Sequence, residues 1–243
     1  RDPRAGRLVA ARDWAVVGSL GANAKWNTHE DEFNTTTFDA TVGARWSSGK
    51  NAVTVGGQFQ DFELDNDRYR ETKGVIGQWQ YSLDERTQFT LYGQAADLHY
   101  PTQDIRDATR MVLGAAFGRV FAGEYTPVLF VSAYAGEEKV HADDVPWLGD
   151  KLAGVRAGGQ LRIGTGWTAF GNLAYERREY GGIDPLFLVE RQDNQVDFTF
   201  GLSYLLRPNT TLVAQYNYTD VDSNIQINSF TRNVTMLSLR FNF

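Results

Sequence analysis

The side chains most capable of chemistry in this chain are cations and amides spaced two residues apart within apolar segments. Arg156, Gln160 and Arg162 share one parity, and Val155 and Leu161 share the other. Side chains of a strand alternate between its two faces, so such a strand has one polar and one apolar face. Charged side chains that line a pore set its selectivity. The pattern predicts a lumen lined by Lys25, Asp39, Arg45, Gln58, Gln78, Arg110, Arg156, Gln160, Arg162, Glu176, Arg178, Asp197, Arg232 and Arg240.

About twelve segments follow this alternating pattern, and each must form a strand for the polar side chains to share a face. They span residues 14–26, 36–47, 52–62, 72–82, 87–99, 109–121, 126–137, 151–163, 167–180, 192–206, 210–219 and 230–243. Each is about as long as, or longer than, the roughly 9–11 residues with which a strand crosses a bilayer.

The breaks between these segments alternate in kind. Tight turns rich in Gly, Pro, Asn and Asp occur at 47–51, 83–86, 122–124, 164–166 and 207–209, and longer polar loops at 27–34, 63–71, 100–107, 139–150, 181–190 and 220–228. Short turns at one end and long loops at the other are typical of outer-membrane barrels. We therefore predict an all-β fold, a transmembrane antiparallel up-and-down β-barrel of about 12 strands with both termini periplasmic. Residues 13–243 form this barrel, and residues 1–12 are expected to be a periplasmic linker or the remnant of an upstream domain.

Composition excludes several other classes of protein. No apolar run approaches the ~18 residues of a transmembrane helix, which excludes helical spanning. The formal net charge of −6 argues against a nucleic-acid partner. The absence of cysteine excludes disulfides and thiolate chemistry. Residues 1–7 lack the apolar core of a signal peptide, so we expect that a signal has been removed.

Aromatic residues and the last strand indicate where the protein resides. Aromatic side chains make up 13% of the chain, and many lie at strand ends, where the girdles of membrane barrels belong. The predicted girdle comprises Trp14, Trp26, Trp46, Trp79, Trp167, Tyr204, Phe241 and Phe243. A terminal Phe on an alternating strand resembles the sorting signal of bacterial outer-membrane barrels. We predict a monomer in the bacterial outer membrane, with the lipid bilayer and lipopolysaccharide as surroundings and the barrel-assembly machinery as a partner of the Phe243 strand.

Two other polar groups suggest different chemistry. His141 and Asp143 are residue types with which outer-membrane proteases activate water, but general-base catalysis needs a second acidic pair within hydrogen-bond reach. Asp61, Glu63 and Asp65 place oxygen atoms at alternating spacing, as calcium prefers, without a glycine-centred twelve-residue loop. No Ser/His motif of a lipase accompanies them. We therefore expect no catalytic residue, no metal and no cofactor, and predict that the protein is not an enzyme.

Short motifs in the last third of the chain carry a family resemblance. They lie at residues 175–180, at Phe187, at 190–193, at 220–225 and at Arg232. Together they resemble the barrel domain of the surface lipoprotein assembly modifier family, in which barrels follow tetratricopeptide repeats. The present chain has no such repeat, and its strand count is lower than that of the family's barrel. The resemblance implies an export barrel that moves lipoproteins to the cell surface together with a periplasmic partner domain.

These observations leave four functions open, of which one, a structural or adhesive barrel, would follow from a blocked lumen. The Arg- and Gln-rich face favours a passive outer-membrane channel for small polar or anionic solutes, gated by the longer loops, in particular residues 139–150. The resemblance favours export or translocation of protein or lipoprotein. A rim hydrolase of the protease or lipase class would require His141 and Asp143 to act together.

Overall fold

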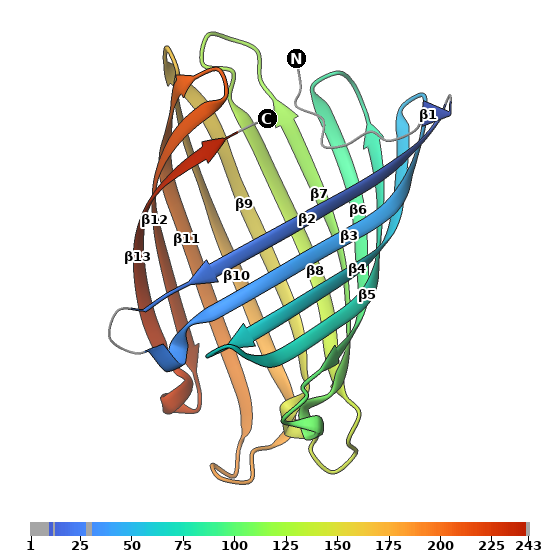
Figure 1. Cartoon of the computed structure of the whole chain (residues 1–243), viewed down its shortest axis with the longest axis vertical. Helices are drawn as coiled ribbons and strands as arrows, with labels where there is room; N and C mark the ends of the chain where they lie inside the picture. Colours follow the sequence, from blue (N-terminus) through green and yellow to red (C-terminus); the bar gives the residue numbers. More distant parts are fainter. Residues whose placement is uncertain (1–9, 12, 28–30, 242–243) are drawn as a thin grey trace. The chain divides into compact units, whose positions relative to one another are not determined.

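Antiparallel strands account for almost all of the computed structural model, which describes residues 10–11, 13–27 and 31–241 (Figure 1). The strands are β1 (Ala10–Ala11), β2 (Trp14–Lys25), β3 (Thr35–Ser48), β4 (Asn51–Leu64), β5 (Asp67–Ser82), β6 (Thr87–His99), β7 (Ala108–Val120), β8 (Val128–Val140), β9 (Asp150–Gly164), β10 (Trp167–Ile183), β11 (Glu190–Arg207), β12 (Thr210–Ser223) and β13 (Phe230–Phe241). Four short 3₁₀ turns lie in the loops: η1 (Asp31–Phe33), η2 (Asp104–Arg106), η3 (Pro146–Leu148) and η4 (Gln226–Asn228). The twelve long strands confirm the predicted up-and-down all-β fold.

Each strand is hydrogen-bonded to the strand that follows it in sequence, from β1 to β13. Neighbours pair directly opposite, so the alternation of one strand is carried to the next. Thr41 of β3, for example, lies opposite Gln58 of β4, and Val42 lies opposite Gly57. A slip of one residue would exchange the two faces, so the hydrophobic pattern excludes such a slip.

The connection between β4 and β5 differs from the prediction. Residues 63–71 were expected to form a long loop, but the strands extend to Leu64 and from Asp67, and only Asp65 and Asn66 lie between them. Both have positive φ angles, 54° and 63°. Asp and Asn tolerate this left-handed conformation, and two such residues make the type I′ turn of a tight hairpin. The polar residues counted as loop are therefore strand residues.

Three other connections also differ in length. The predicted tight turn at 122–124 is a longer connection, from Phe121 to Pro127, because Pro127 has no N–H to contribute to a ladder. The predicted loops at 181–190 and 220–228 are shorter, because β10, β11 and β12 continue into their polar segments. Backbone pairing continues where the side chains are polar on both faces.

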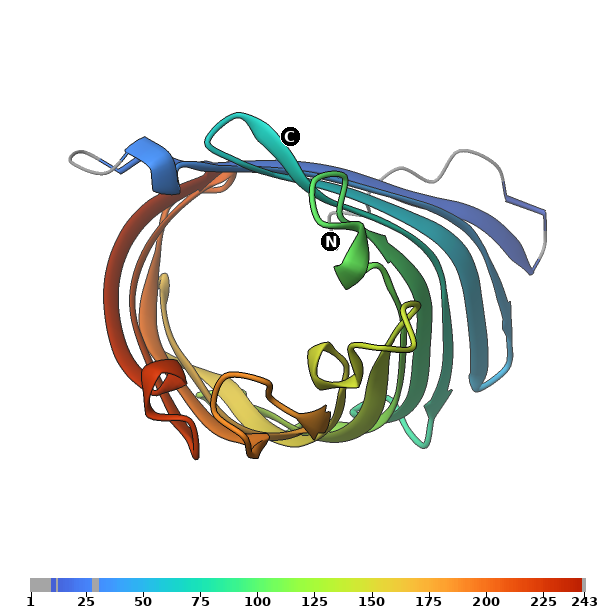
Figure 2. The same ribbon diagram turned by 90° about the horizontal axis from the view of Figure 1, so that it is seen from below.

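The chain divides into two compact units that share β6, β7 and β8. Unit 1 comprises Arg1–Tyr81, Leu91–Leu113 and Gly136–Asp150, and unit 2 comprises Ser82–Thr90, Gly114–Ala135 and Lys151–Phe243. In unit 2, β10 to β13 follow one another along a curved wall (Figure 2). Within the described residues, no helix is long and apolar enough to cross a membrane.

Candidate functional site: the polar face

The register places the predicted lumen residues on one face of each unit, which we call the polar face. In unit 1 these are Lys25, Asp39, Arg45, Gln58, Gln78 and Arg110. In unit 2 they are Arg156, Gln160, Arg162, Glu176, Arg178, Asp197, Arg232 and Arg240. The opposite face, the apolar face, includes Val42 and Val55 in unit 1 and Leu173 and Phe198 in unit 2, all of them exposed.

The polar face of unit 1 holds a chain of amide-mediated hydrogen bonds. Gln60 Nε2 donates to Asp39 Oδ1 at 2.8 Å, and Arg70 Nη2 donates to Gln60 Oε1 at 3.1 Å. Nearby, Gln94 Nε2 donates to Gln58 Oε1 at 3.0 Å. These residues line a hollow of ≈ 350 Å³ together with Arg110. Glutamine is neutral, so Gln60 holds the Arg70 side chain by a hydrogen bond without cancelling its positive charge.

The polar face of unit 2 holds two ion-paired clusters near its loop end. Glu176 accepts from Tyr134 Oη and from Arg178 Nε, both at 2.6 Å. Arg191 donates twice to Asp193, at 3.0 and 2.6 Å, and its guanidinium lies 4.5 Å from the centroid of the Tyr180 ring. These bidentate and shared contacts fix the side chains against the wall. The four charges of these clusters are therefore committed to each other.

Carboxylates and arginines of the polar face are matched unevenly. Asp197 accepts from Gln195 Nε2 and from Thr219 Oγ1, both at 2.7 Å, and these neutral donors leave its negative charge uncancelled. Among the described residues, seven polar-face arginines form no ion pair: Arg45, Arg70, Arg110, Arg156, Arg162, Arg232 and Arg240. Three polar-face carboxylates, those of Asp39, Glu138 and Asp197, likewise form no ion pair in the described part of the chain. The balance leaves the polar face with available positive charge.

Three aromatic residues on the polar face were not predicted as site residues. Phe130, Tyr134 and Phe170 each fill the space that a side chain would occupy at a glycine of the neighbouring strand. A Cβ at Gly158 would lie 2.7 Å from Phe130 Cζ, and a Cβ at Gly154 would lie 2.5 Å from Tyr134 Cζ. Phe170 covers Gly201 in the same way. The sequence does carry a signal for them. These aromatics are spaced by multiples of two from polar residues of the same strand, and the neighbouring strand has glycines on the same face.

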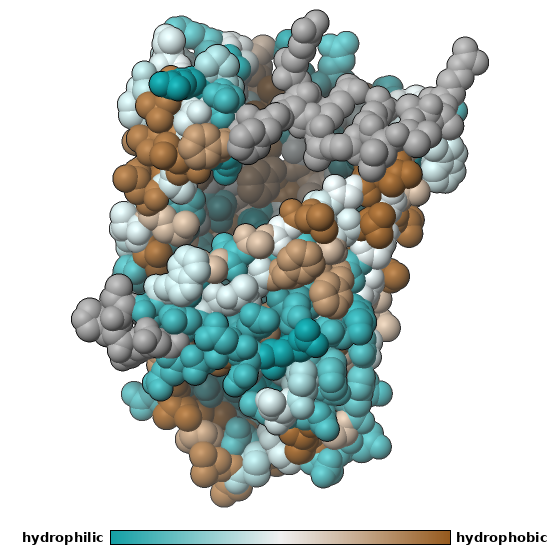
Figure 3. Space-filling view, viewed as in Figure 1, coloured by the Kyte–Doolittle hydropathy of each residue, from teal (hydrophilic) through white to brown (hydrophobic). Residues whose placement is uncertain are grey.

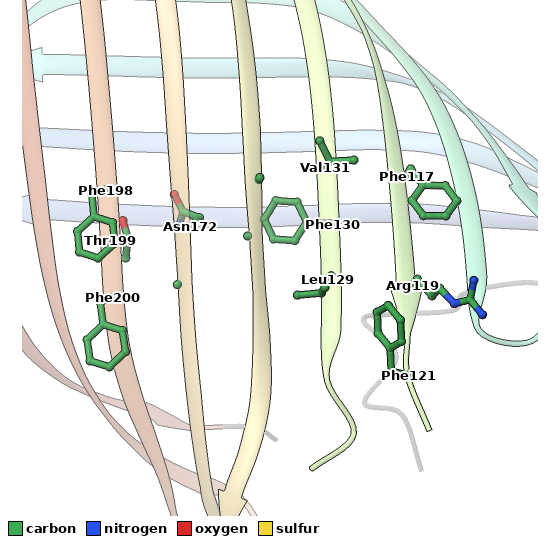
Figure 4. A pocket seen from close by; sticks show the side chains of 13 residues that line it. Phe117, Arg119, Phe121, Leu129, Phe130, Val131, Asn172, Phe198, Thr199 and Phe200 are labelled. Carbon is green, nitrogen blue, oxygen red and sulfur yellow. The ribbon is translucent and has the colours of Figure 1, made fainter. Parts of the chain in front are cut away.

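The position of Phe130 is visible in Figure 4. Its ring and the side chain of Asn172 project toward β9 from opposite sides, over the backbone at Gly158. On the other face, Leu129, Val131, Phe198 and Phe200 border a shallow apolar depression of ≈ 600 Å³. Such a surface suits contact with lipid chains.

Predicted girdle residues lie on the apolar face. Trp14 pairs with Trp46, which pairs with Val53, which in turn pairs with Trp79, and the four form a row across β2 to β5 at the short-turn end. In unit 2 the rings of Trp167 and Tyr204 lie 4.6 Å apart, and Phe241 lies opposite Thr210. Trp26 follows the other end of β2 and is highly exposed. Phe243 lies outside the described residues.

Charged residues gather at the loop end of the apolar face in unit 1. Arg68 Nη2 lies 2.8 Å from Asp61 Oδ2, and Lys73 pairs with Glu71. Figure 3 shows hydrophilic side chains over the lower ends of β3 to β5. Because Asp61 is committed to Arg68 and Asp65 forms the hairpin turn, these oxygen atoms do not converge as calcium ligands would.

His141 lies on this surface in unit 1 with Thr109 and Asp97. Its Nε2 atom is 3.0 Å from Thr109 Oγ1 and 3.4 Å from Asp97 Oδ1. A hydrolase triad requires the acid on one ring nitrogen and the nucleophile on the other. Both partners here contact the same nitrogen, so the arrangement lacks the geometry of a nucleophile activated by a base.

The loop from Tyr100 to Asp107 is clamped by Asp107. Its carboxylate accepts from the Tyr100 N–H at 2.7 Å and lies 2.8 Å from His99 Nδ1. Partial burial raises the pKa of Asp107, but the hydrogen bonds from Tyr100 and His99 outweigh it and hold that pKa below its ordinary value. Arg106 Nη1 donates to Tyr69 Oη at 2.7 Å and stacks over Tyr100. In the loop between β8 and β9, Trp147 packs against a buried apolar cluster made of Leu98, Tyr100, Ala108, Val140 and Val145.

Comparison with known proteins supports the fold. Residues 159–243 match the model of the family described as Putative beta-barrel porin 2. The CymD monoaromatic hydrocarbon channel superposes with a TM-score of 0.52 at 11% identity, over 96% of this chain and 80% of that one. The copper transporter OprC gives 0.48 at 12% identity, over 98% of this chain and 43% of that one. The translocator domain of autotransporter NalP from Neisseria meningitidis gives 0.37 at 11% identity, over 97% and 90%. A search of curated proteins finds no match.

The alternating strands, the family match and the superposition on CymD together define the class of protein. The chain has the β-barrel fold of bacterial outer-membrane proteins, and its residues 159–243 are similar to a porin family. The match to the porin model covers the segment that resembles the surface lipoprotein assembly modifier barrels. It does not confirm that narrower resemblance.

Proposed function

We propose that the protein is a passive outer-membrane channel that favours small anionic or polar solutes. In this proposal the polar face lines the lumen, and the short turns and both termini face the periplasm. The observation that carries it is the charge balance of the polar face: seven arginines without an ion pair against the three carboxylates of Asp39, Glu138 and Asp197, among the described residues. Fixed positive charge along a pore lowers the energy of an anion within it and raises that of a cation.

The surroundings of the barrel follow from the same proposal. The apolar face contacts the bilayer, and the charged residues beyond it, such as Arg68 and Lys73, meet the lipopolysaccharide headgroups. The last strand serves as the substrate of the barrel-assembly machinery, and the protein acts as a monomer. It is not an enzyme, and the His141 geometry supports this proposal.

The test is the reversal potential of purified protein in planar bilayers under a KCl gradient. We expect steady conductance with chloride preference, and Arg156→Gln or Arg162→Gln moves the reversal potential toward zero. Arg177→Gln is the matched control, because Arg177 lies on the opposite face of β10 and pairs with Glu179. Silence at all voltages, or a cation preference, would overturn the proposal.

A second candidate is an export barrel of the surface lipoprotein assembly kind, acting with a periplasmic domain. The observation that favours it is the clustering of the residues that carry that resemblance, with Glu176–Arg178 and Arg191–Asp193 forming adjacent ion pairs. A silent bilayer, combined with loss of a lipoprotein from the surface of cells lacking this protein, would support this function over the channel.

A further inference from the structure

A hollow of ≈ 470 Å³ on the polar face of unit 2 combines apolar and cationic lining. Its volume falls in the range of small-molecule sites. Phe130, Phe170 and Val213 give it an apolar wall, and Gln160, Asn172 and Arg240 give it polar groups. The site lies near the short-turn end of β8 to β13.

The register orders these groups along the wall. Phe170, Gly201, Gln215 and Met236 form one cross-strand row, and Thr168, Ser203, Val213 and Ser238 form the next row toward the short turns. Arg240 lies opposite Thr211, one step beyond. A ligand in the hollow therefore has an aromatic surface on one side and a guanidinium on the side of the short turns.

Both rings are held by glycines. Phe130 lies over Gly158 and Phe170 over Gly201, so each ring fills the space left by the missing side chain. Phe130 is nonetheless 38% exposed, so its ring offers a flat apolar surface to the hollow. Arg240 is exposed and has no ion pair among the described residues.

We propose that this hollow binds small aromatic monocarboxylates, with the ring of the ligand against Phe130 and Phe170 and its carboxylate on Arg240. The proposal rests on the channel function and narrows its solute class. An aromatic ring gains area and stacking contact with Phe. A planar carboxylate matches the fork of arginine donors. A purely inorganic anion would use only Arg240, and a neutral aromatic would use only the rings.

The test is titration calorimetry on the purified, detergent-solubilised protein with benzoate, acetate and benzamide as probes. We expect benzoate to bind at least tenfold more tightly than either acetate or benzamide. Arg240→Gln removes the preference for benzoate over benzamide, and Arg240→Lys restores part of it. Phe130→Leu with Phe170→Leu removes the preference for benzoate over acetate. Arg177→Gln, on the other face, leaves all affinities unchanged.

The outcomes separate this site from the channel function. Equal affinity for the three probes, or benzoate binding that Arg240→Gln leaves intact, overturns the site even if the protein conducts. Selective benzoate binding by a protein that is silent in bilayers supports the site and refutes the channel. Each variant is first checked for the heat-dependent shift in gel mobility of a folded barrel, and Arg240→Lys provides the charge-conserving comparison if Arg240→Gln does not fold.

Discussion

Gly201→Ala should destabilise the barrel because the Phe170 ring occupies the place of the new methyl group. A Cβ at Gly201 would lie 2.8 Å from Phe170 Cε2, and 2.9 Å from the carbonyl oxygen of Ala214. The ring can rotate away, whereas the backbone oxygen can move only with its strand. Overpacking of this kind costs about 1–3 kcal/mol. We expect a loss of about 2 kcal/mol in the free energy of unfolding, on the scale of that principle.

The measurement is urea unfolding of the protein in lipid vesicles, followed by the fluorescence of its six tryptophans. Gly164→Ala is the control, because a Cβ there has nothing within 4 Å, and it should change stability by less than about 0.5 kcal/mol. In a Phe170→Ala background the cost of Gly201→Ala should fall, with a coupling energy of at least about 0.5 kcal/mol. Additive effects of the two changes, or a Gly201→Ala protein as stable as its parent, would refute the packing argument.

Three further predictions concern stability. Glu176→Gln removes the carboxylate that accepts from Arg178 Nε and Tyr134 Oη, and it should cost about 2 kcal/mol in the same unfolding assay, since hydrogen bonds to charged groups are worth about 1.5–3 kcal/mol. Glu179→Gln on the opposite face should cost much less. Asp107 has a lowered pKa in the folded protein, so its contribution is complete above its unfolded value of about 4 and is lost as pH falls through the folded value. Stability measured from about pH 6 down to pH 3 should therefore fall less steeply in Asp107→Asn, and identical slopes would contradict the assignment. Asn66→Val places a β-branched residue at φ 63° and should destabilise the hairpin by at least about 1 kcal/mol. Asn66→Gly should be neutral or stabilising. Equal unfolding midpoints for the two variants would count against the type I′ turn.

Much of the fold could be predicted from the sequence because alternation is a local signal. Two faces of opposite character recur in every long strand, so the strand count and the face of residues such as Arg156 and Asp197 followed from parity alone. The strand ends could not be predicted in this way, because segments such as 63–71, which includes Glu63 and Glu71, carry polar side chains on both faces of the strand. There the ladder continues through backbone hydrogen bonds, which side-chain polarity does not encode.

Turn chemistry was only partly predictable. Gly49 in the turn between β3 and β4 has a φ of 55°, which agrees with its role as a hairpin residue. Asp65 and Asn66 form an equally tight turn, but they are embedded in a run of charged residues that resembles a loop. A left-handed conformation costs Asp or Asn little, so these two residues do not require a turn by themselves. The pairing of the flanking strands determines that they form one.

The sequence by itself determined that this is an all-β outer-membrane protein with one polar and one apolar face, because burial in lipid leaves every second residue apolar. Tertiary structure decided which arginines are neutralised. Arg178 and Arg191 pair with carboxylates two residues away on their own strands, whereas Arg156 and Arg240 form no ion pair among the described residues. Tertiary structure also decided that Phe130 and Phe170 lie against glycines of neighbouring strands and open a hollow beside Arg240. The ring contacts depend on which cross-strand neighbours the register brings together. A slip of two residues would keep every side chain on its face, so local alternation does not select among such registers.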